Sequence, residues 1–389
     1  MSELPETTDV LVIGAGPTGL ALAATLHARG VGCQVVDAAE EGGNYSRAVG
    51  TLPRTLEMLR ELKVAERLAE AGNRAERIRI FSGDRDRNIA TLRLDRLRTD
   101  FPFAVLLPQH VNEAVLLGRL RELGGDVHRP YRVSAVQQSA SEVVATVTGT
   151  DGERRTVRAA YAVGADGTRS DVRKLIKAGF PGETFAQRFI LADLELAEGS
   201  TPDEIHLFFS RAGAVIMGRM PGRLHRVCLS VDELPGELTA ERVEALLRER
   251  GPARRRIRVL DVANESYTKI HHRVAERFRV GRVFLAGDAA HVNSPIIGQG
   301  MNLGIQDAIT LGDLLARALT GGGPGVLDDY ERIRLPIARD AVGVTRRINA
   351  AATVRSPVKG AVRDSLMPLT TFPPLNRRMI YRLTRLVDR

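Results

Sequence analysis

The sequence predicts an α/β fold in which a Rossmann-like domain is interrupted by a mainly antiparallel β-sheet domain and followed by C-terminal helices. Three observations support this prediction. A short apolar run, a glycine-rich turn and a helical pattern open the chain at residues 9–29. Several strand-like runs and one helical run fill residues 185–270. A second apolar strand with a glycine-rich helix start follows at residues 283–302, as expected when one layered domain is inserted in another.

The length and composition are those of an ordinary globular protein. The 389 residues suffice for about two domains, and 43% of them are hydrophobic and 26% charged. Cys33 and Cys228 form no C-x-x-C motif, so we expect buried, reduced thiols in a cytoplasmic protein. The acidic N-terminus lacks the order of a signal peptide, and no apolar run has membrane-spanning length. We expect a monomer or homodimer without an integral membrane segment.

The positive charge of the chain is concentrated at its C-terminal end. The net charge is +9, and residues 345–389 hold ten basic residues against two acidic ones. The remainder is therefore almost neutral, which disfavours a nucleic-acid-binding surface. We expect a basic helical segment at residues 346–389 that lies on the body of the protein with a solvated face. The alternative is peripheral contact of this segment with an acidic membrane.

The first element is a β-α-β unit of the dinucleotide-binding type. A strand at residues 9–13 leads into a glycine-rich turn and a helix that ends before Gly30, and a second strand at residues 33–36 ends at Asp37. Glycines here allow a tight turn, close approach of a pyrophosphate and helix–strand packing, while Asp37 would accept hydrogen bonds from the adenosine ribose. The unit alone does not distinguish FAD from NAD. The turn residues expected to bind the cofactor are Gly14, Gly16, Pro17, Thr18 and Gly19.

The middle of the chain predicts a β-meander and then a second sheet. Helical patterns cover residues 51–71 and 111–123. Strand-like runs at 133–136, 143–147 and 156–163 lead to Gly164-Ala165-Asp166-Gly167. The second sheet is predicted from runs at 189–196, 205–209, 214–220 and 226–231, with a helix at 241–249.

A third glycine-rich element follows a buried strand at residues 283–286. Gly287 and Asp288 end this strand, and the Asp288 carboxylate can accept hydrogen bonds from ribityl or ribose hydroxyls. After Pro295, the glycines permit close approach of a flat ligand, and a helix from about Met301 would point its first N–H groups at it. Such a helix start favours an anionic ring. The expected ligand-contacting residues of this segment are Gly298, Gly300, Met301 and Asn302.

Later elements complete the predicted organisation of the chain. A glycine-rich loop at residues 321–325 separates two further helices. We expect a cofactor-binding domain in two parts, a substrate-binding sheet domain between them, and a basic helical segment at the end. The corresponding ranges are 1–180 and 276–345, 181–275, and 346–389.

The three glycine–acid elements together point to one family. GAGPTG at 14–19, GADG at 164–167 and GDAAH at 287–291 lie far apart, and GADGTRSDVR at 164–173 extends the second of them. In this combination the chain resembles the class A FAD-dependent monooxygenases, the aromatic hydroxylases of the para-hydroxybenzoate hydroxylase and polyketide hydroxylase types. The resemblance spans residues 10–339.

The resemblance implies further cofactor contacts. It brings Arg47 to the flavin and Gln109 to the ribityl or phosphate region, and Val133 completes the expected set. It associates Asp166 with the handling of both FAD and the nicotinamide nucleotide. It gives His291 a role in packing and flavin-loop support, in place of the catalytic role that its position after the Gly-Asp pair would otherwise indicate.

The resemblance also implies the reaction. NADPH or NADH reduces the flavin, O2 forms a flavin C4a-hydroperoxide, and one oxygen atom passes to an aromatic or polycyclic molecule, in secondary metabolism or aromatic catabolism. The substrate should lie between the second sheet and the flavin. Phe208, Met217 and Arg219 are candidates for its walls, although strand alternation allows them equally to be core or outer-face residues. The sequence assigns no catalytic residue and no metal, because the adjacent His271 and His272 would point to opposite faces of a strand.

One departure and three alternatives remain. Ile297 occupies a position where many members of the family have a glycine, which predicts a difference in flavin-loop movement. The same fold serves isoprenoid reductases and Baeyer–Villiger or epoxidising enzymes, whereas the absence of tryptophan disfavours a flavin halogenase. An FAD-binding redox sensor without turnover is the alternative from another functional class.

Overall fold

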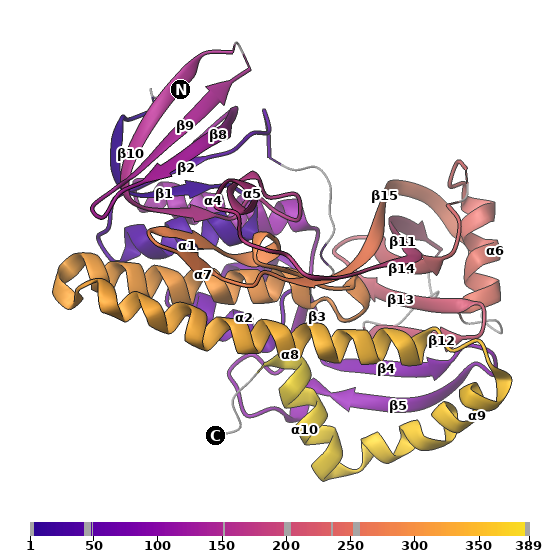
Figure 1. Cartoon of the computed structure of the whole chain (residues 1–389). Coiled ribbons are helices and arrows are strands. Elements are labelled where there is room, and N and C mark those ends of the chain that lie inside the picture. Colours follow the sequence, from indigo (N-terminus) through magenta and orange to yellow (C-terminus); the bar gives the residue numbers. More distant parts are fainter. Residues whose placement is uncertain are drawn as a thin grey trace.

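The computed structural model describes residues 4–42, 48, 50–150, 152–197, 204–234, 236–251 and 257–385. Two eight-stranded sheets form its two halves, and the long helix α8 extends along both of them (Figure 1). The predicted α/β architecture, with a Rossmann-like half and a mainly antiparallel second sheet, is confirmed.

The first sheet has a parallel centre with the order β17-β10-β1-β2-β7. Its central strands are buried on both faces, which explains their unbroken apolar sequences. The edge strand β16 and the hairpin β8–β9 pair antiparallel with this centre. The strands are β1 (Thr7–Ile13), β2 (Cys33–Val36), β7 (Val127–His128), β8 (Tyr131–Gln138), β9 (Val143–Gly149), β10 (Arg154–Gly164), β16 (Arg279–Val280) and β17 (Val283–Leu285).

Helices cover the first sheet and position its turns. α1 packs against both α4 and α7, and its residues 19–26 are fully buried, so it is the central helix of this half. The two-stranded ribbon β3 (Asn73–Ala75) and β6 (Ala104–Leu106) joins this half to the second sheet. The helices are α1 (Pro17–Ala28), α2 (Pro53–Arg60), α3 (Ala65–Ala71), α4 (Gln109–Glu122), α5 (Asp171–Leu175) and α7 (Gln299–Arg317).

The second sheet has the order β18-β15-β11-β14-β13-β12-β4-β5. Its neighbours are antiparallel except for β12 and β4, which run parallel. The strands are β4 (Arg77–Ser82), β5 (Arg87–Arg93), β11 (Gly182–Leu196), β12 (Ile205–Ser210), β13 (Gly213–Arg219), β14 (Leu224–Val231), β15 (Val259–Val274) and β18 (His291–Val292).

Four strands of this sheet were not predicted, namely β4, β5, β15 and β18. β4 and β5 come from residues 77–93, so the sheet is not built from the predicted segment 181–275 alone. The alternation Arg77-Ile78-Arg79-Ile80 is a strand signal that could have identified β4. The division of the chain into domains remains a prediction.

The two faces of the second sheet are covered differently. Helix α6 (Ala240–Arg250), predicted at 241–249, closes one face over a core that includes Val243 and Leu247. The opposite face looks toward α8 and the C-terminal helices and contributes to a separate core. Cys33 lies in the first half and Cys228 in the second sheet, and burial raises the pKa of both thiols to about 12.

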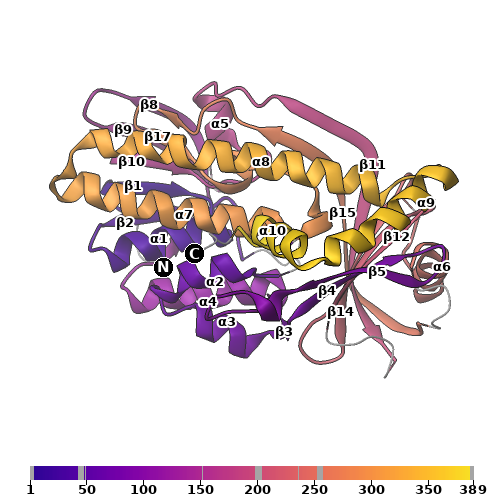
Figure 2. The ribbon, with the colours of Figure 1, turned by 90° about the horizontal axis from the view of Figure 1, so that it is seen from below.

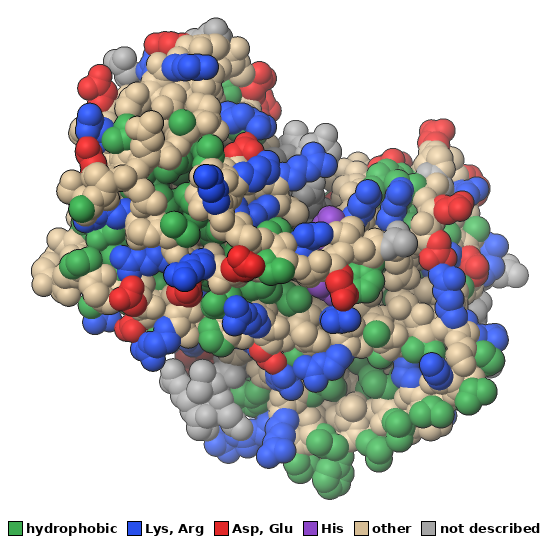
Figure 3. Space-filling view, in the orientation of Figure 1, with side chains coloured by type: hydrophobic (Ala, Val, Ile, Leu, Met, Phe, Trp, Pro, Cys, Tyr) green, Lys and Arg blue, Asp and Glu red, His purple; other side chains and the backbone are tan. Residues whose placement is uncertain are grey.

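The C-terminal helices fold back against the second sheet. α8 (Asp328–Ala352) is continuous through the predicted boundary at 345/346, and it lies beside α7 (Figure 2). α9 (Pro357–Leu366) and α10 (Pro373–Thr384) follow, and hydrophobic side chains gather on the surface over this part of the molecule (Figure 3). Within the described residues, no helix combines the length and the apolar character needed to cross a membrane.

Candidate cofactor cleft and substrate cavity

Two cavities meet in the centre of the molecule. The first is a cleft of about 1060 Å³ at the carboxyl ends of the first sheet, with β11 and β15 as its far wall. The second is an apolar cavity of about 160 Å³ between the second sheet and the C-terminal helices. Pro295 and Gly298 line both, so this segment is the boundary between them.

The glycine turn after β1 forms the floor of the cleft. Gly14 has φ +107°, and a Cβ there would lie 2.4 Å from the Ala165 carbonyl oxygen, so only glycine fits. A Cβ on Gly16 would meet nothing within 4 Å, because this residue faces the open cleft together with Pro17 and Thr18. Helix α1 starts there without a capping side chain, so its first N–H groups are available to an anion.

Asp37 stands at the end of β2, as predicted. Its carboxylate accepts hydrogen bonds from Ala15 N at 2.6 Å and Ala39 N at 2.8 Å. Arg129 Nη1 also donates to Asp37 Oδ1 at 2.9 Å, a contact that the sequence analysis missed. Two backbone N–H groups and Arg129 therefore fix this carboxylate in place. Asp37 is not among the residues that line the cleft, so its contact with the cofactor remains a prediction.

Asp166 offers a free oxygen to the cleft. Its Oδ2 accepts hydrogen bonds from Asp171 N at 2.7 Å and Val172 N at 3.0 Å, which start helix α5. Its Oδ1 is buried and has no hydrogen-bond partner. Burial raises the pKa of Asp166, although these hydrogen bonds and that of Ser170 oppose the rise. A buried acceptor without a partner is costly, and a ligand hydroxyl would satisfy it.

The Gly287-Asp288 turn is supported from behind by a buried ion-pair network. Asp307 Oδ2 accepts hydrogen bonds from Gly287 N at 3.1 Å and His291 Nε2 at 2.6 Å, and its Oδ1 accepts from Arg334 Nε at 2.6 Å. All three side chains are buried. His291 therefore has the packing role that was predicted. On the cleft side, Asp288 Oδ2 accepts a hydrogen bond from Thr168 Oγ1 at 3.0 Å.

The segment after Pro295 forms a tight turn into α7. Gly298 has φ +62°, and the helix begins at Gln299, two residues before the predicted start. Gly300 and Met301 line the cleft, and no side chain caps the helix.

The side chain of Asn302 is engaged by the protein backbone, and the predicted contact of this residue with the cofactor remains a prediction. Its side chain donates to the carbonyl oxygens of Gly50 and Gly298 at 2.9 and 2.8 Å and accepts from Leu52 N at 2.8 Å. All of these partners are backbone groups of the protein. Asn302 thus connects the segment around Leu52 to the turn at Gly298 by hydrogen bonds, and this residue is not among those that line the cleft.

Of the three remaining predicted contacts, Arg47 lies outside the described residues. Gln109 lines the cleft, where its Nε2 donates to Glu113 Oε1 at 2.8 Å and its Oε1 accepts from Ala48 N at 3.3 Å. Val133 is buried in the core of the first half and lines neither cavity. Its contact with the cofactor remains a prediction.

A buried ion pair connects the second sheet to Ala48. Arg226 and Asp193 pair on neighbouring strands, and Arg226 Nη1 donates to the Ala48 carbonyl oxygen at 2.9 Å. Sequence analysis missed this pair because nothing in the local pattern of β11 or β14 distinguishes a buried ion pair from outer-face charges.

The sheet wall of the cleft carries cations that were also missed. Arg188 on β11 and Lys269 on β15 lie directly opposite each other, and both line the cleft. Neither forms an ion pair with any described residue. Opposed like charges destabilise a sheet, so this wall favours an anionic ligand. His271 lines the same wall, whereas His272 is buried on the other face of β15, as their adjacency predicted.

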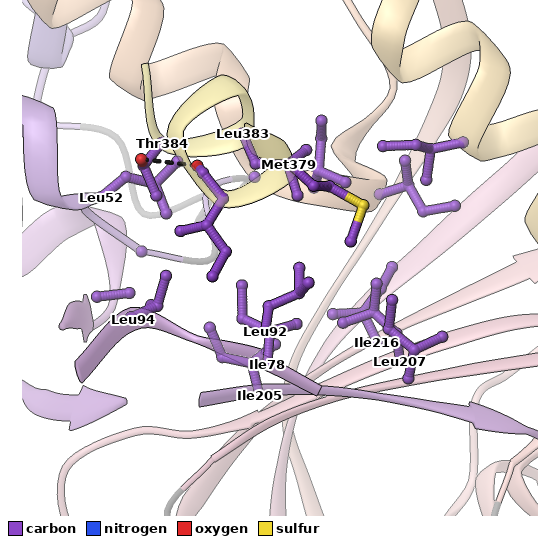
Figure 4. Close-up of a pocket in the computed structure, with 18 of the residues that line it drawn as sticks. Leu52, Ile78, Leu92, Leu94, Ile205, Leu207, Ile216, Met379, Leu383 and Thr384 are labelled. Atoms are coloured by element: carbon purple, nitrogen blue, oxygen red, sulfur yellow. Dashed lines mark hydrogen bonds between the residues drawn. The ribbon is translucent and has the colours of Figure 1, made fainter. Parts of the chain in front are cut away.

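The second cavity is almost entirely apolar. Strands β4, β5, β12 and β13 form one wall, and α8 and α10 form the other (Figure 4). Among the described residues that line it, Thr384 has the only polar side chain, and its Oγ1 donates to the Ile380 carbonyl oxygen at 2.8 Å. The predicted departure, Ile297, is one of the lining residues. The lining side chains labelled in Figure 4 are Leu52, Ile78, Leu92, Leu94, Ile205, Leu207, Ile216, Met379, Leu383 and Thr384.

The predicted wall residues do not line this cavity. Phe208 and Met217 point to the opposite face of the sheet, into the core under α6, where Phe208 stacks on Phe81 at 4.9 Å. Arg219, at the end of β13, lines neither cavity. Their neighbours Leu207 and Ile216 face the cavity instead. Alternation separated the two faces correctly but could not identify the face toward the cofactor.

The cleft fits FAD. Gly16 leaves space beside an uncapped helix start for a pyrophosphate, and Asp166 Oδ1 is an acceptor without a partner. A second uncapped helix start, at Gly300 and Met301, lies beside the turn at Gly298, where a flat ring can approach the backbone. No group of three or more potential metal ligands occurs among the described residues.

Comparisons with known proteins agree with this geometry. A family model described as an FAD binding domain matches residues 7–345. A flavin-dependent monooxygenase of Mycobacteroides abscessus is 36% identical over 86% of this chain and 73% of its own length. The rifampicin monooxygenase of Streptomyces venezuelae is 35% identical over 97% of this chain and 78% of its own length. The structure of p-nitrophenol 4-monooxygenase from Pseudomonas putida DLL-E4 superposes with a TM-score of 0.88 at 25% identity, covering 98% of this chain and 99% of that one. The chain therefore belongs to the FAD-dependent monooxygenases that hydroxylate aromatic compounds.

Proposed function

We propose that this flavin-dependent monooxygenase hydroxylates an apolar aromatic compound that binds in the cavity between the second sheet and α10. The observation that carries the proposal is that Pro295 and Gly298 line both this cavity and the cofactor cleft. A substrate in the cavity is then separated from the cofactor only by the segment that the flavin ring is expected to approach. FAD, when bound and reduced, supplies the activation of O2 and the transfer of one oxygen atom.

The chain itself contributes orientation and exclusion of water. Walls made of leucine, isoleucine and methionine bind a ring by burying it, and they keep water from the reacting atoms. The volume of about 160 Å³ is close to that of a cavity of about 150 Å³ that binds benzene in another protein. We therefore favour a substrate with one ring or two fused rings. The name of the similar p-nitrophenol 4-monooxygenase supports a substrate of this size, whereas the name of the rifampicin monooxygenase supports a larger one.

The cavity offers no general base. Among its described lining residues, none has a carboxylate, imidazole or amine, and the Thr384 hydroxyl already donates to Ile380. That hydroxyl oxygen can still accept one hydrogen bond from a substrate hydroxyl. For phenols, we expect the rate to rise with pH through the pKa of the phenol itself.

The reaction can be tested by measuring oxygen uptake by the purified protein with NADPH or NADH and a panel of aromatics of increasing size. We expect uptake to start on addition of a small apolar aromatic, with one oxygen atom incorporated into the product. Anaerobic reduction of an alkene would instead indicate a reductase. Failure of every nicotinamide donor to reduce the flavin, with or without an aromatic, would favour a redox sensor and overturn the proposal.

We further infer that Arg188 and Lys269 receive the phosphates of the nicotinamide nucleotide, the usual co-substrate of this family. Both line the cleft, they are opposed in the β11–β15 ladder, and neither has an anionic partner among the described residues. A phosphate between them would relieve their repulsion and form charge-assisted hydrogen bonds.

Two substitutions test the role of these cations. Arg188→Gln or Lys269→Gln should raise the KM for the nicotinamide nucleotide about tenfold, the loss expected for one charge-assisted hydrogen bond. Reduction by dithionite and binding of FAD should not change. Arg258→Gln, just before β15 and outside the cleft, is the matched control. An effect on NADPH alone indicates the 2′-phosphate, an equal effect on NADH indicates the pyrophosphate, and no effect on either contradicts the assignment.

A further inference from the structure

The surface of the C-terminal helices has an unusual concentration of exposed apolar side chains. Ten large hydrophobic side chains are exposed in the described chain, and six of them lie within residues 358–375. These six are between 49% and 71% exposed. We call them the apolar stripe: Val358, Val362, Leu366, Leu369, Phe372 and Leu375.

The stripe continues from α9 onto the start of α10. Val358, Val362 and Leu366 are four residues apart on α9 and therefore share one face of the helix. The remaining three follow at intervals of three residues through the turn before α10 and its first turn. Hydrophobic side chains form a band in this part of the space-filling view (Figure 3). Such a continuous exposed band is more than the scattered hydrophobic side chains of an ordinary surface.

Polar contacts fix the orientation of both helices, with the stripe pointing outward. Asp364 is buried on the inner side of α9, where it accepts a hydrogen bond from Ser82 at the end of β4. Asn376 is buried on the inner side of α10 and donates to the Thr91 carbonyl oxygen on β5 at 3.0 Å. An ordinary surface helix points its polar side chains to water and its apolar ones inward. Here each helix is held by a buried polar anchor on its inner side and also exposes apolar side chains on its outer side, which is the pattern of a surface that docks.

The charge beside the stripe identifies the partner. Lys359, Arg377 and Arg378 are exposed in this region. The only acid among residues 355–385 is the buried Asp364. An apolar face flanked by cations is typical of helices that lie in the interface of an anionic bilayer. A stable dimer usually buries about 20 to 30 residues a side, many more than the stripe contains.

From these observations we propose that the apolar stripe docks the enzyme peripherally on an anionic lipid membrane. The side chains of the stripe insert among the acyl chains near the headgroups, and the flanking cations contact the lipid phosphates. The sequence left open peripheral contact of the basic C-terminal segment with an acidic membrane. The proposal assigns this contact to a defined surface, the outer face of α9 and α10.

This orientation has a consequence for substrate entry, which rests on the proposed function. The inner face of α10 lines the apolar cavity through Met379, Ile380 and Leu383. The same helix would therefore have lipid on one side and the cavity on the other. Apolar aromatics dissolved in the bilayer could reach the cavity past α10 without crossing water.

Vesicle binding by the holoenzyme tests the docking surface without reference to catalysis. The protein is sedimented with vesicles of phosphatidylcholine alone and of phosphatidylcholine with phosphatidylglycerol. We expect it to bind the second kind and to dissociate as salt is raised toward about 1 M. The double variant L369S/F372S should lower the bound fraction about tenfold or more, because it removes two large apolar side chains from the stripe. The control L260S/I333S changes two exposed side chains outside the stripe and should bind like the wild type.

Three results would overturn the docking proposal. One is absence of binding to anionic vesicles, and another is an equal loss of binding in the control variant. The third is a wild-type dimer that L369S/F372S converts to a monomer without any vesicle binding, since the stripe would then be a homodimer interface. Flavin absorbance and the melting temperature should be unchanged in both variants, because all four side chains are exposed. A failed search for a hydroxylation substrate would leave these measurements unaffected.

Discussion

The cofactor cleft and the apolar cavity share two lining residues but are built in different ways. The shape of the cleft depends on backbone turns and on carboxylates held by hydrogen bonds. Gly14, Asp37 and Asp166 can therefore each be replaced by few other residue types. The cavity depends on the summed bulk of interchangeable apolar side chains from several elements. Cofactor chemistry is therefore sensitive to single residues, whereas substrate choice can change by repacking one wall. This difference predicts how strongly each region should respond to substitution.

The largest effect is expected behind the cleft, at Asp307. Burial alone would raise the pKa of this carboxyl, but the charges and hydrogen bonds of Arg334 and His291 lower it overall. Asp307→Asn leaves Arg334 buried without its counter-charge, which should cost about 3–5 kcal/mol in the free energy of unfolding. Urea unfolding at neutral pH measures this loss.

A surface ion pair on the same helix is the control for Asp307. Asp313 on α7 pairs with the exposed Arg29, so Asp313→Asn should cost less than about 1 kcal/mol. The contribution of Asp307 to stability also depends on pH, in a direction set by its pKa shift. The pKa of Asp307 is lower in the folded protein than its ordinary value of 3.8. Its contribution to the free energy of unfolding is therefore complete above pH 3.8 and declines as the pH falls through the pKa of the folded state. Equal losses for the two variants would contradict the importance of the buried network.

Inside the cleft, Asp166→Asn should weaken the binding of FAD without unfolding the turn. The amide oxygen can still accept from the N–H groups of Asp171 and Val172, but an NH2 replaces the free Oδ1. Loss of one hydrogen bond to a charged acceptor predicts about 10- to 100-fold weaker FAD binding. Fluorescence titration of the apoprotein with FAD gives this value. Asp171→Asn is the control, since Asp171 pairs with Arg132 and Lys174. Unchanged affinity in Asp166→Asn would remove this carboxylate from the cofactor site.

The same contrast explains what the sequence could predict. Asp37, Asp166 and Asp288 each follow a buried strand, so the local pattern was enough to predict their positions at strand ends, and Asp166 and Asp288 line the cleft. Arg188 and Lys269 became neighbours only through the register of β11 with β15, which no local pattern contains. Strand alternation predicts two faces but not their direction, so the cavity walls were assigned to Phe208 and Met217, although their neighbours line the cavity.

The assignment of the two faces can be tested on one strand. Ile216→Phe should fill part of the cavity and lower kcat/KM for an aromatic substrate about tenfold. This is the effect expected when a poorer fit costs about 1–2 kcal/mol of transition-state binding. Met217→Leu on the opposite face is a volume-conserving core change and should leave kcat/KM within about twofold. Steady-state kinetics with the best substrate compares them, and melting temperatures check the fold. A larger kinetic effect of Met217→Leu would place the substrate on the α6 side of the sheet.

The smallest effect is expected where the two cavities meet, at Ile297. This side chain lines the substrate cavity, and its β-branched carbon restricts the turn between Pro295 and Gly298. Ile297→Gly enlarges the cavity and frees the backbone of the turn, a change worth about 0.4–1 kcal/mol in chain entropy. We therefore expect the rate of flavin reduction by the nicotinamide nucleotide to change by about two- to fivefold, measured by stopped-flow absorbance. The variant should also consume more oxygen per product, because a looser wall excludes water less well. If Ile297→Ala, which enlarges the cavity but keeps a side chain on the turn, gives the same reduction rate as Ile297→Gly, cavity volume and not backbone freedom is the cause.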